Sequence, residues 1–416
     1  MLIKSNLQMK KLWTFSLMLY IICSSAFSYG DLRMLNTYAL YLFLGVSAFC
    51  MLLRGKIRLN HSFLSVVLYA VIMMIGFFYT PSQESAVRRI LYNYATMAII
   101  VICVIQFIDS KEDISHILTA YMLAGLALAI YVYAQYGNEF WTIMQENTEA
   151  TDTDVNRMGS ELANANTIGL YTAISAMIAI YKLIFEKNKL WKKILYIAIV
   201  VFCFVIDMAS ASKKGVIMLA VVAICMWLYS AWGTKNILKQ IRNIALLVAA
   251  FVIVYRIIIN TPMFSGIVIR MEGLFDVLGG TGTNASDATR MNMVKTAISV
   301  WLENPIFGAG TYSSNYYFGV YAHNNYVELL MNSGVIGFAV FYFPQIAALF
   351  KYLTCYKQYK ENSKLSILLF ALFAGILVCG MAAVYYFDRY FMILIVTICA
   401  STKVFGTKEQ YAEQLK

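Results

Sequence analysis

Residues 286–338 read SDATRMNMVKTAISVWLENPIFGAGTYSSNYYFGVYAHNNYVELLMNSGVIGF, and this stretch decides how the rest of the chain is interpreted. A helix is expected to begin at a Ser286 or Asp287 cap, because these side chains accept hydrogen bonds from the free N–H groups of a first turn. It is expected to stop before Pro305, because a residue that precedes proline is steered out of the α region. Six residues at helical spacing form the expected apolar face: Met291, Val294, Ala297, Ile298, Trp301 and Leu302.

Arg290 falls at the edge of that apolar face, nearer its centre than the polar side. We therefore expect its guanidinium to point toward protein or membrane rather than into bulk water. After the helix, Gly308 and Gly310 permit a tight turn. His323 and Asn324 then precede a short second helix at 326–331 and the start of another apolar segment.

The composition predicts an all-α, polytopic membrane protein. Of the 416 residues, 61% are hydrophobic and 13% are charged, whereas soluble domains are roughly 45–50% apolar. We interpret residues 1–416 as one integral membrane domain and the first apolar stretch as an uncleaved helix rather than a signal peptide. The eight cysteines fall in apolar segments or in a basic loop, which indicates neither a disulfide framework nor a thiolate zinc site.

An apolar run of about 18 or more residues can cross a bilayer as a helix. By that rule we expect about twelve transmembrane helices. They are placed at 12–30, 34–53, 61–79, 90–108, 116–137, 166–185, 194–211, 216–232, 244–260, 333–350, 365–384 and 387–402.

Basic residues set the expected orientation. The N-terminal lysines and the basic clusters near 54–58, 182–193, 235–242 and 351–364 all fall on one side of these spans. The positive-inside rule therefore places both termini in the cytoplasm. The long loops 138–165 and 261–332 then lie outside, and the second is expected to be helical. The net charge of +11 is attributed to topology and to attraction for membrane lipids, not to nucleic acid.

The chain contains three histidines, and only His323 falls on the expected outer side. One interpretation is a hydrogen-bonded loop residue. The other is a general base, because imidazole has an ordinary pKa near 6.5 and titrates close to neutral pH. The residues themselves leave both open.

Six cations in the segments expected outside suggest an anion site: Arg157, Lys213, Lys214, Arg270, Arg290 and Lys295. Lys213 and Lys214 lie in a short turn at 210–215, where short outer loops normally avoid lysine. They could instead extend to lipid headgroups. Arg157 with Asn166 supplies a cation and an amide at the start of another span. Asp207 and Arg256 lie just inside span ends, where charge suggests pairing or function.

Two further patterns are weak. Asp152 and Asp154 have spacing that could hold a divalent metal, but the acidic loop around them is typical of a solvated segment. We expect no metal there. The glycines in the later outer segment follow no strand, so a flexible loop is favoured over a phosphate cradle: Gly279, Gly280 and Gly282.

Taken together, these motifs resemble the bacterial O-antigen ligase and Wzy-type polysaccharide polymerase family. The resemblance is carried by the loop 305–310, by His323-Asn324, by Gly334 and Gly337, and by Arg290 upstream. It also includes Ser212-Lys213, with lysine in place of the usual arginine, and an Arg-x-Gly pattern followed by asparagines: Arg157, Gly159, Asn164 and Asn166. The resemblance therefore allows either Lys213 or Lys214 to act, and neither can make the planar bidentate contact of an arginine.

The resemblance implies transfer of a glycan from undecaprenyl diphosphate to an acceptor hydroxyl, outside the cytoplasmic membrane of a bacterium and without nucleotide sugar, metal or other cofactor. It favours His323 as the base. It assigns the diphosphate to Arg290, Lys213, Lys214 and Arg157, with supporting roles for Asn324, Ser212, Asn166, Gly308 and Gly310.

Three functions remain open from the sequence. The first is a polymerase that joins lipid-linked repeat units of a capsule, exopolysaccharide or O-antigen, and this one is preferred. The second is a ligase that passes the glycan to another acceptor. The third is a lipid-linked glycan transporter. The family context implies a flippase and a chain-length regulator as partners.

Overall fold

The computed structural model describes residues 2–28, 30–147, 150, 155–159, 164–233, 236–278 and 285–406. Within these residues the chain forms helices and loops, with no strand. The first half contains α1 (Leu2–Ala26), α2 (Arg33–Arg54), α3 (His61–Phe77), α4 (Glu84–Ile105), α5 (Lys111–Tyr136), α6 (Glu139–Glu146), α7 (Ala165–Phe185) and α8 (Leu190–Ala209). The second half contains α9 (Lys213–Ala231), α10 (Ile237–Asn260), η2 (Pro262–Phe264), α11 (Ser265–Leu278), α12 (Ala285–Glu303), α13 (Ser314–Phe318), α14 (Asn325–Thr354), α15 (Tyr356–Asn362), α16 (Leu365–Cys379) and α17 (Arg389–Gly406).

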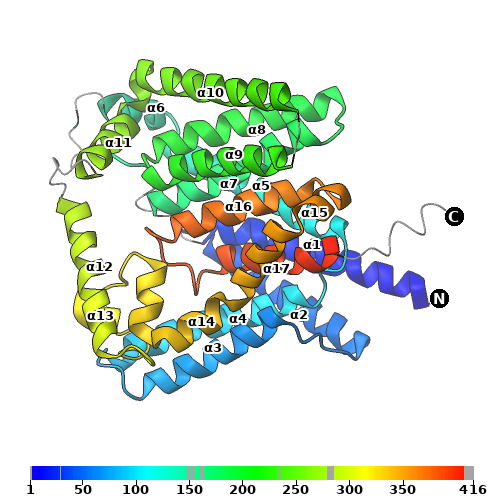
Figure 1. The fold of residues 1–416 in the computed structure, drawn as a ribbon, viewed down its shortest axis with the longest axis vertical. Coiled ribbons are helices and arrows are strands. Elements are labelled where there is room, and N and C mark those ends of the chain that lie inside the picture. The colour runs from blue at the N-terminus through cyan, green and yellow to red at the C-terminus, as the bar shows by residue number, and fades with distance from the viewer. Residues whose placement is uncertain are drawn as a thin grey trace.

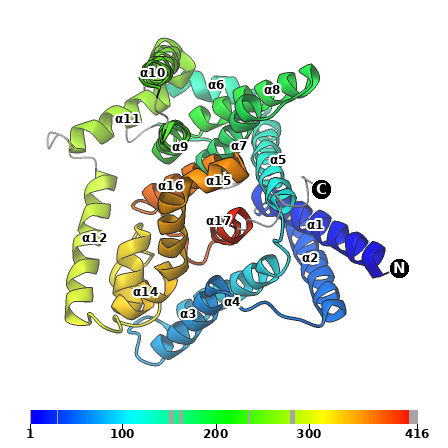
Figure 2. The same cartoon turned by 45° about the vertical axis from the view of Figure 1, so that its right-hand side comes forward.

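The long helices run side by side as a bundle. In Figure 1 the start of α1 lies at the right, whereas α12 and α13 lie at the left. One group is formed by α5, α7, α8 and α9, and α16 packs against α9. A second group pairs α3 with α4 and α14, and α17 packs beside α4. Figure 2 shows α12 alongside α14 at the edge of the bundle.

Eight of the described helices are long and apolar enough to cross a membrane: α2, α4, α5, α7, α9, α10, α14 and α17. The expected all-α membrane architecture is therefore confirmed. The four other expected spans fall in α1, α3, α8 and α16. Of these, α3 and α16 are shorter, with 17 and 15 residues. The count of twelve stays a prediction.

A break in α14 separates the outer segment from a span. Gly334 has φ +59° and ψ −166° inside this helix, a conformation that glycine adopts without the steric cost of a side chain. The break follows the short helix expected at 326–331 and begins the span expected at 333–350. Both long segments expected outside contain helices of their own, among them α6 and α11.

Candidate functional site

Apolar packing places α12 against the start of α14. Ala297 and Val300 from α12 are buried with Val327 and Met331 from α14 and with Ala322 from the connecting loop. The helix ends at Glu303, so the expected stop before proline is confirmed. At its start the described part of the helix begins at Ala285. The side chains of the expected caps, Ser286 and Asp287, lie outside what the structure describes.

The buried row of α12 differs from the expected apolar face. Met291, Ile298 and Leu302 have exposed fractions of 53%, 39% and 64%. Ala297 is fully buried. Arg290 precedes it by seven residues, about two helical turns, so both residues lie on the same side of the helix. Arg290 is half-buried. Of the expected apolar face, Val294 and Ala297 do pack inward, so the packed side of the helix overlaps that face in part.

The Pro-Gly loop is held by backbone contacts on two sides. The amide of Ala309 donates to Met331 O at 2.7 Å, and the amide of Thr311 donates to Gly76 O at 3.1 Å. Gly308 has φ +73°, and a Cβ there would lie 2.5 Å from the Ser333 nitrogen. Gly310 has φ +99°, and a Cβ there would lie 2.6 Å from Thr80 Cα. Both glycines are thus required by close backbone approach.

His323 lies in the loop that leads into α14. Its φ is +56°, which is uncommon for a residue with a side chain. The ring is half-buried and makes an edge contact with the Tyr321 ring, with centroids 4.6 Å apart. The next residue, Asn324, caps α14 by accepting hydrogen bonds from Tyr326 N at 3.0 Å and Val327 N at 3.2 Å. The cap fixes where the helix begins and so fixes the backbone that carries the imidazole.

Glu328 is a structural residue that the sequence analysis missed. This fully buried carboxylate accepts from Ala322 N at 2.6 Å, Ser314 Oγ at 2.7 Å and Asn332 Nδ2 at 2.9 Å. It therefore joins the start of α14 to the loop that carries His323. The sequence feature that could have identified it is a glutamate within an apolar segment, because a buried carboxylate needs hydrogen-bond partners.

A second loop holds Arg157. Its Nε donates to Ser210 O at 3.2 Å, and its Nη2 donates to Asn166 Oδ1 at 3.0 Å. The same amide oxygen accepts from Ser212 Oγ at 3.4 Å. Ser212 also caps α9 through Gly215 N. The chain Arg157–Asn166–Ser212 thus connects the expected Arg-x-Gly segment to the turn that carries the lysines.

The two lysines at that turn differ in their surroundings. Lys213 is buried, with 9% of its surface exposed, and it has an interaction partner. Lys214 is partly exposed, and its charge acts on His323. Of the two lysines, Lys214 is therefore the one whose charge acts on the imidazole.

Burial and nearby cations lower the pKa of His323 to about 4. Burial contributes most, followed by the charges of Arg290 and Lys214. These three residues come from α12, from the start of α9 and from the loop before α14. The structure thus brings them close enough to interact electrostatically, and it leaves the imidazole neutral at neutral pH.

Arg157 belongs to the same electrostatic group. Burial, and then the charges of Arg270 and Arg290, lower the pKa of its guanidinium to about 10. Arg270 on α11 is an addition to the expected site. Four cations therefore converge: Arg157, Lys214, Arg270 and Arg290. Crowding like charges is unfavourable unless an anion occupies the space between them.

Other candidates fall outside this group. Lys295 is exposed on α12, and Arg256 is exposed on α10. Asp207 is fully buried, and neither of its oxygens has a hydrogen-bond partner within the described chain. The described residues contain no cluster of acidic, histidine or cysteine side chains able to hold a metal. The remaining weak patterns lie outside the described residues: Asp152, Asp154, Gly279, Gly280 and Gly282.

Comparison with known families identifies the central part of the chain. Residues 198–342 match the family model described as O-antigen ligase. The domain formed by these residues is similar to O-antigen ligases. The match covers about a third of the chain, and it includes Lys214, Arg270, Arg290 and His323 but not Arg157. No curated protein matches the chain significantly.

The resemblance predicted from the sequence is therefore confirmed for this domain. The O-antigen ligase family comprises membrane glycosyltransferase-like enzymes of bacteria. The apolar helices and the family match together indicate a bacterial membrane protein whose residues 198–342 resemble this family.

Proposed function

We propose that this protein is a polysaccharide polymerase that joins oligosaccharide repeat units carried on undecaprenyl diphosphate. The observation that supports this function best is a group of cations beside a neutral imidazole: Arg290 and Lys214 act on His323, and Arg290 also interacts with Arg157, as does Arg270. Such a site suits a reaction in which an anionic diphosphate leaves while a neutral hydroxyl loses a proton. The products would be capsule, exopolysaccharide or O-antigen chains.

The proposed reaction is a single displacement at the anomeric carbon of the donor glycan. His323 accepts the proton of the acceptor hydroxyl as that oxygen forms the new glycosidic bond. The bond between the anomeric carbon and the phosphate oxygen breaks, and undecaprenyl diphosphate leaves with the electron pair. The imidazolium then returns its proton to solvent. One displacement requires no carboxylate nucleophile and predicts inversion at the anomeric carbon.

The cations would act on the leaving group. Arg290 and Arg157 can donate paired N–H groups to phosphate oxygens, and Lys214 adds an ammonium charge. Because these charges are already positioned, they stabilise the developing negative charge without reorganising. Lys213 would support the turn rather than contact the diphosphate. Ser212 and Asn166 would hold Arg157, while Asn324, Gly308 and Gly310 would hold the His323 loop.

The test is an assay of purified protein with undecaprenyl-diphosphate-linked repeat units, with chain length read on a gel. Wild-type protein is expected to give a ladder of products. His323→Ala is expected to reduce the rate by about 10²–10⁴-fold, the usual contribution of a general base. His116→Ala on α5 is the matched control and should retain activity. A ladder of normal rate from His323→Ala would overturn the base assignment.

The same assay separates the ligase alternative. Transfer of the whole glycan to an added acceptor lipid, with no growth of the repeat-unit ladder, would identify a ligase. We further propose that the site faces the outside of the cytoplasmic membrane and that a flippase supplies the donor. A chain-length regulator would set product size.

A further inference from the structure

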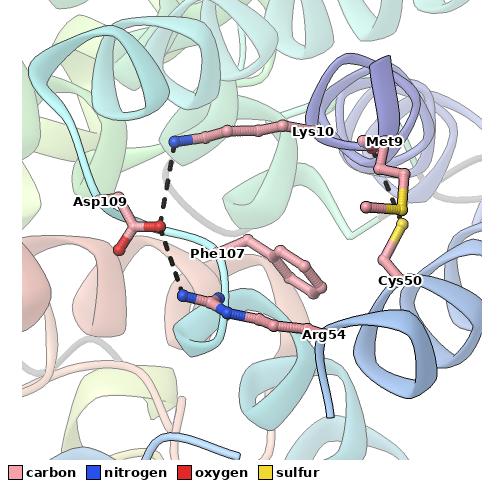
Figure 3. Close-up of a pocket in the computed structure, with 6 residues that line it drawn as sticks. All are labelled: Met9, Lys10, Cys50, Arg54, Phe107 and Asp109. Atoms are coloured by element: carbon pink, nitrogen blue, oxygen red, sulfur yellow. Dashed lines mark hydrogen bonds and ion pairs between the residues drawn. The ribbon is translucent and has the colours of Figure 1, made fainter. Parts of the chain in front are cut away.

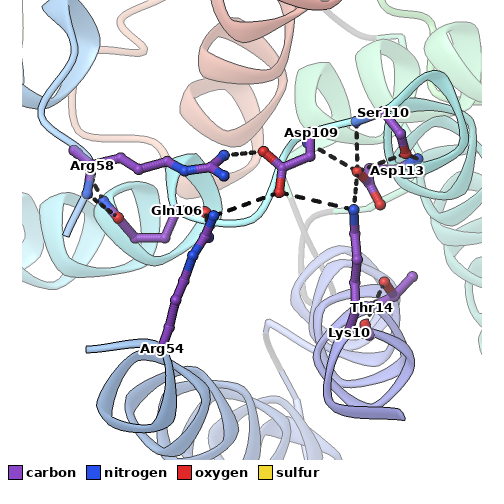
Figure 4. A network of polar contacts seen from close by, with 8 residues as sticks. All are labelled: Lys10, Thr14, Arg54, Arg58, Gln106, Asp109, Ser110 and Asp113. Atoms are coloured by element: carbon purple, nitrogen blue, oxygen red, sulfur yellow. Dashed lines mark hydrogen bonds and ion pairs between the residues drawn. The ribbon is translucent and has the colours of Figure 1, made fainter. Parts of the chain in front are cut away.

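A second cationic cluster lies at the opposite end of the bundle from His323. Three segments supply it: Lys10 comes from α1, Arg54 ends α2, and Arg58 lies in the linker before α3. They surround the loop 106–110 between α4 and α5, which carries Asp109 (Figure 4). Gln106 joins this loop to the linker, because it accepts from Arg58 N at 2.6 Å and donates to Arg58 O at 3.1 Å.

The two carboxylates of the cluster are largely committed to other groups. Asp113 accepts from Asp109 N at 2.9 Å, from Ser110 N at 2.8 Å and from Ser110 Oγ at 2.8 Å, as part of a capping box. It also pairs with Lys10 at 2.7 Å. Asp109 pairs most closely with Arg58. These contacts leave the third cation without a close carboxylate.

That third cation is Arg54. Its Nη2 is 3.9 Å from Asp109 Oδ2, at the outer limit of an ion pair, and the described chain offers it no nearer carboxylate. Its Nη1 donates to Gln106 O, and the guanidinium lies 5.9 Å from the centre of the Phe107 ring. A guanidinium has five N–H donors, so Arg54 can bind a further anion while it keeps these contacts.

Arg54 and Lys10 line a cavity of about 260 Å³. In Figure 3 both side chains point toward Asp109 from different helices, and the Phe107 ring lies between them. Asp109 also lines the cavity, and three further residues complete the lining: Met9, Cys50 and Phe107. The cavity therefore has a polar side, on which two cations face one carboxylate, and an apolar side.

The cavity lies where lipid headgroups would meet the protein. The α2 helix is apolar enough to span a membrane, and Arg54 is its last residue. Beside it, Leu52 and Leu53 have exposed fractions of 80% and 57%, as expected for side chains in contact with lipid. A basic pocket at the end of a spanning helix is the kind of site that binds anionic lipid headgroups.

We propose that this pocket binds the phosphate of an anionic phospholipid, with Arg54 and Lys10 as its ligands. The two cations favour an anionic over a zwitterionic lipid, because a zwitterionic headgroup would bring its own positive group toward them. The apolar side contacts the glycerol and the first part of the acyl chains. The bound lipid would tie α1, α2 and the 106–110 loop together.

The test measures lipid binding by native mass spectrometry of the purified chain in neutral detergent, with added phosphatidylglycerol or phosphatidylcholine. Wild-type protein is expected to retain phosphatidylglycerol. Arg54→Gln should weaken that retention by about fivefold or more, since one cation near a charged headgroup contributes about 1 kcal/mol. Lys351→Gln, which removes an exposed cation at the end of α14, is the matched control and should bind as wild type does.

Lys10→Gln provides a second variant if Arg54→Gln does not fold, and it should also weaken phosphatidylglycerol retention. Equal retention by wild type and by the folded variant would overturn the proposal. So would equal binding of phosphatidylcholine. If inorganic phosphate competes fully at an equal concentration, the pocket is a free-phosphate site and the lipid assignment is wrong.

Discussion

At the scale of single residues, His323 shows how surroundings select a chemical role. An isolated imidazole is about half protonated near pH 6.5. Burial and the charges of Arg290 and Lys214 lower the pKa of His323 to about 4. A base must be unprotonated to accept a proton, so the cations that would bind the diphosphate also keep this imidazole ready.

The pH dependence of activity follows from that pKa. The pH dependence of kcat/KM reports the ionisation of the free enzyme. On lowering the pH from neutral, kcat/KM should therefore stay constant and fall only as the pH approaches about 4. A bound diphosphate stabilises the imidazolium and raises the pKa, so the acid limb of kcat should lie at higher pH. A kcat/KM limb centred near 6.5 would contradict the electrostatic argument.

Arg290→Gln offers a check that does not need turnover. Removing this charge should raise the pKa of His323 toward its ordinary value, because one of the three influences that lower it is lost. The titration can be followed by NMR of protein labelled in its three histidines. His323→Ala identifies the relevant signal. An unchanged titration in Arg290→Gln would show that the two side chains do not interact.

The lysine pair gives a prediction about neighbouring residues of the same type. Lys214→Gln should reduce kcat more than Lys213→Gln, by about tenfold, because only Lys214 acts on the His323 environment. Lys213 is buried beside the Ser212 cap, so its loss should chiefly lower thermal stability. Activity and melting temperature measured on both variants separate these effects. The reverse order of activity would restore Lys213 as the phosphate ligand.

The sequence singled out cations in the segments expected outside, but it could not predict which of them meet. Arg157, Lys214 and Arg290 were expected at the site, whereas Arg270 was noted only as another outer cation. Its approach to Arg157 depends on how α11 packs, and no local pattern encodes that contact. Likewise, adjacent lysines at the start of a helix differ in direction by about 100°, so only the packing of α9 could separate them.

At the scale of elements, the site depends on how α12 and the Pro-Gly loop meet α14. Helix periodicity predicted α12, its end and the inward packing of Val294 and Ala297, but it placed Met291, Ile298 and Leu302 on the same inner face. These side chains are exposed. In a membrane protein apolar residues can face lipid as readily as protein, so hydrophobicity alone does not choose the packed face of such a helix.

Two glycines with similar backbone angles test the loop contact. A Cβ at Gly308 would lie 2.5–2.6 Å from backbone atoms of the 332–334 segment. Gly308→Ala should therefore cost several kcal/mol, the sum of left-handed strain, about 1–2 kcal/mol, and a clash with backbone. Gly319 has φ +70° but nothing within 4 Å of an added Cβ. Gly319→Ala should therefore lower the free energy of unfolding only by the left-handed strain.

Thermal unfolding and chain growth measured on both variants provide the comparison. Gly308→Ala should also reduce activity, because the same backbone contacts hold the loop beside α14, which His323 precedes. If Gly308→Ala is no less stable than Gly319→Ala, close approach of the loop to α14 is not required for the fold.

At the scale of the whole molecule, apolar run length predicted the all-α membrane architecture well. It could not place the individual helices α6 and α11 in the segments expected outside, because short amphipathic helices leave little hydropathy signal. It also could not place α12 against α14, since that contact rests on a few small side chains such as Ala297 and Ala322. The orientation of the bundle stays a prediction from charge.

That orientation can be tested by cysteine labelling in a variant whose native cysteines are replaced. A cysteine at Tyr316, which is 64% exposed in the segment before His323, should react with a membrane-impermeant maleimide in intact cells. A cysteine at Lys351, exposed at the far end of α14, should react only after permeabilisation. The helix α14 is expected to cross the membrane between residues 316 and 351, with the end that carries Lys351 inside. The reverse pattern would place His323 in the cytoplasm, where the proposed acceptor glycan does not grow.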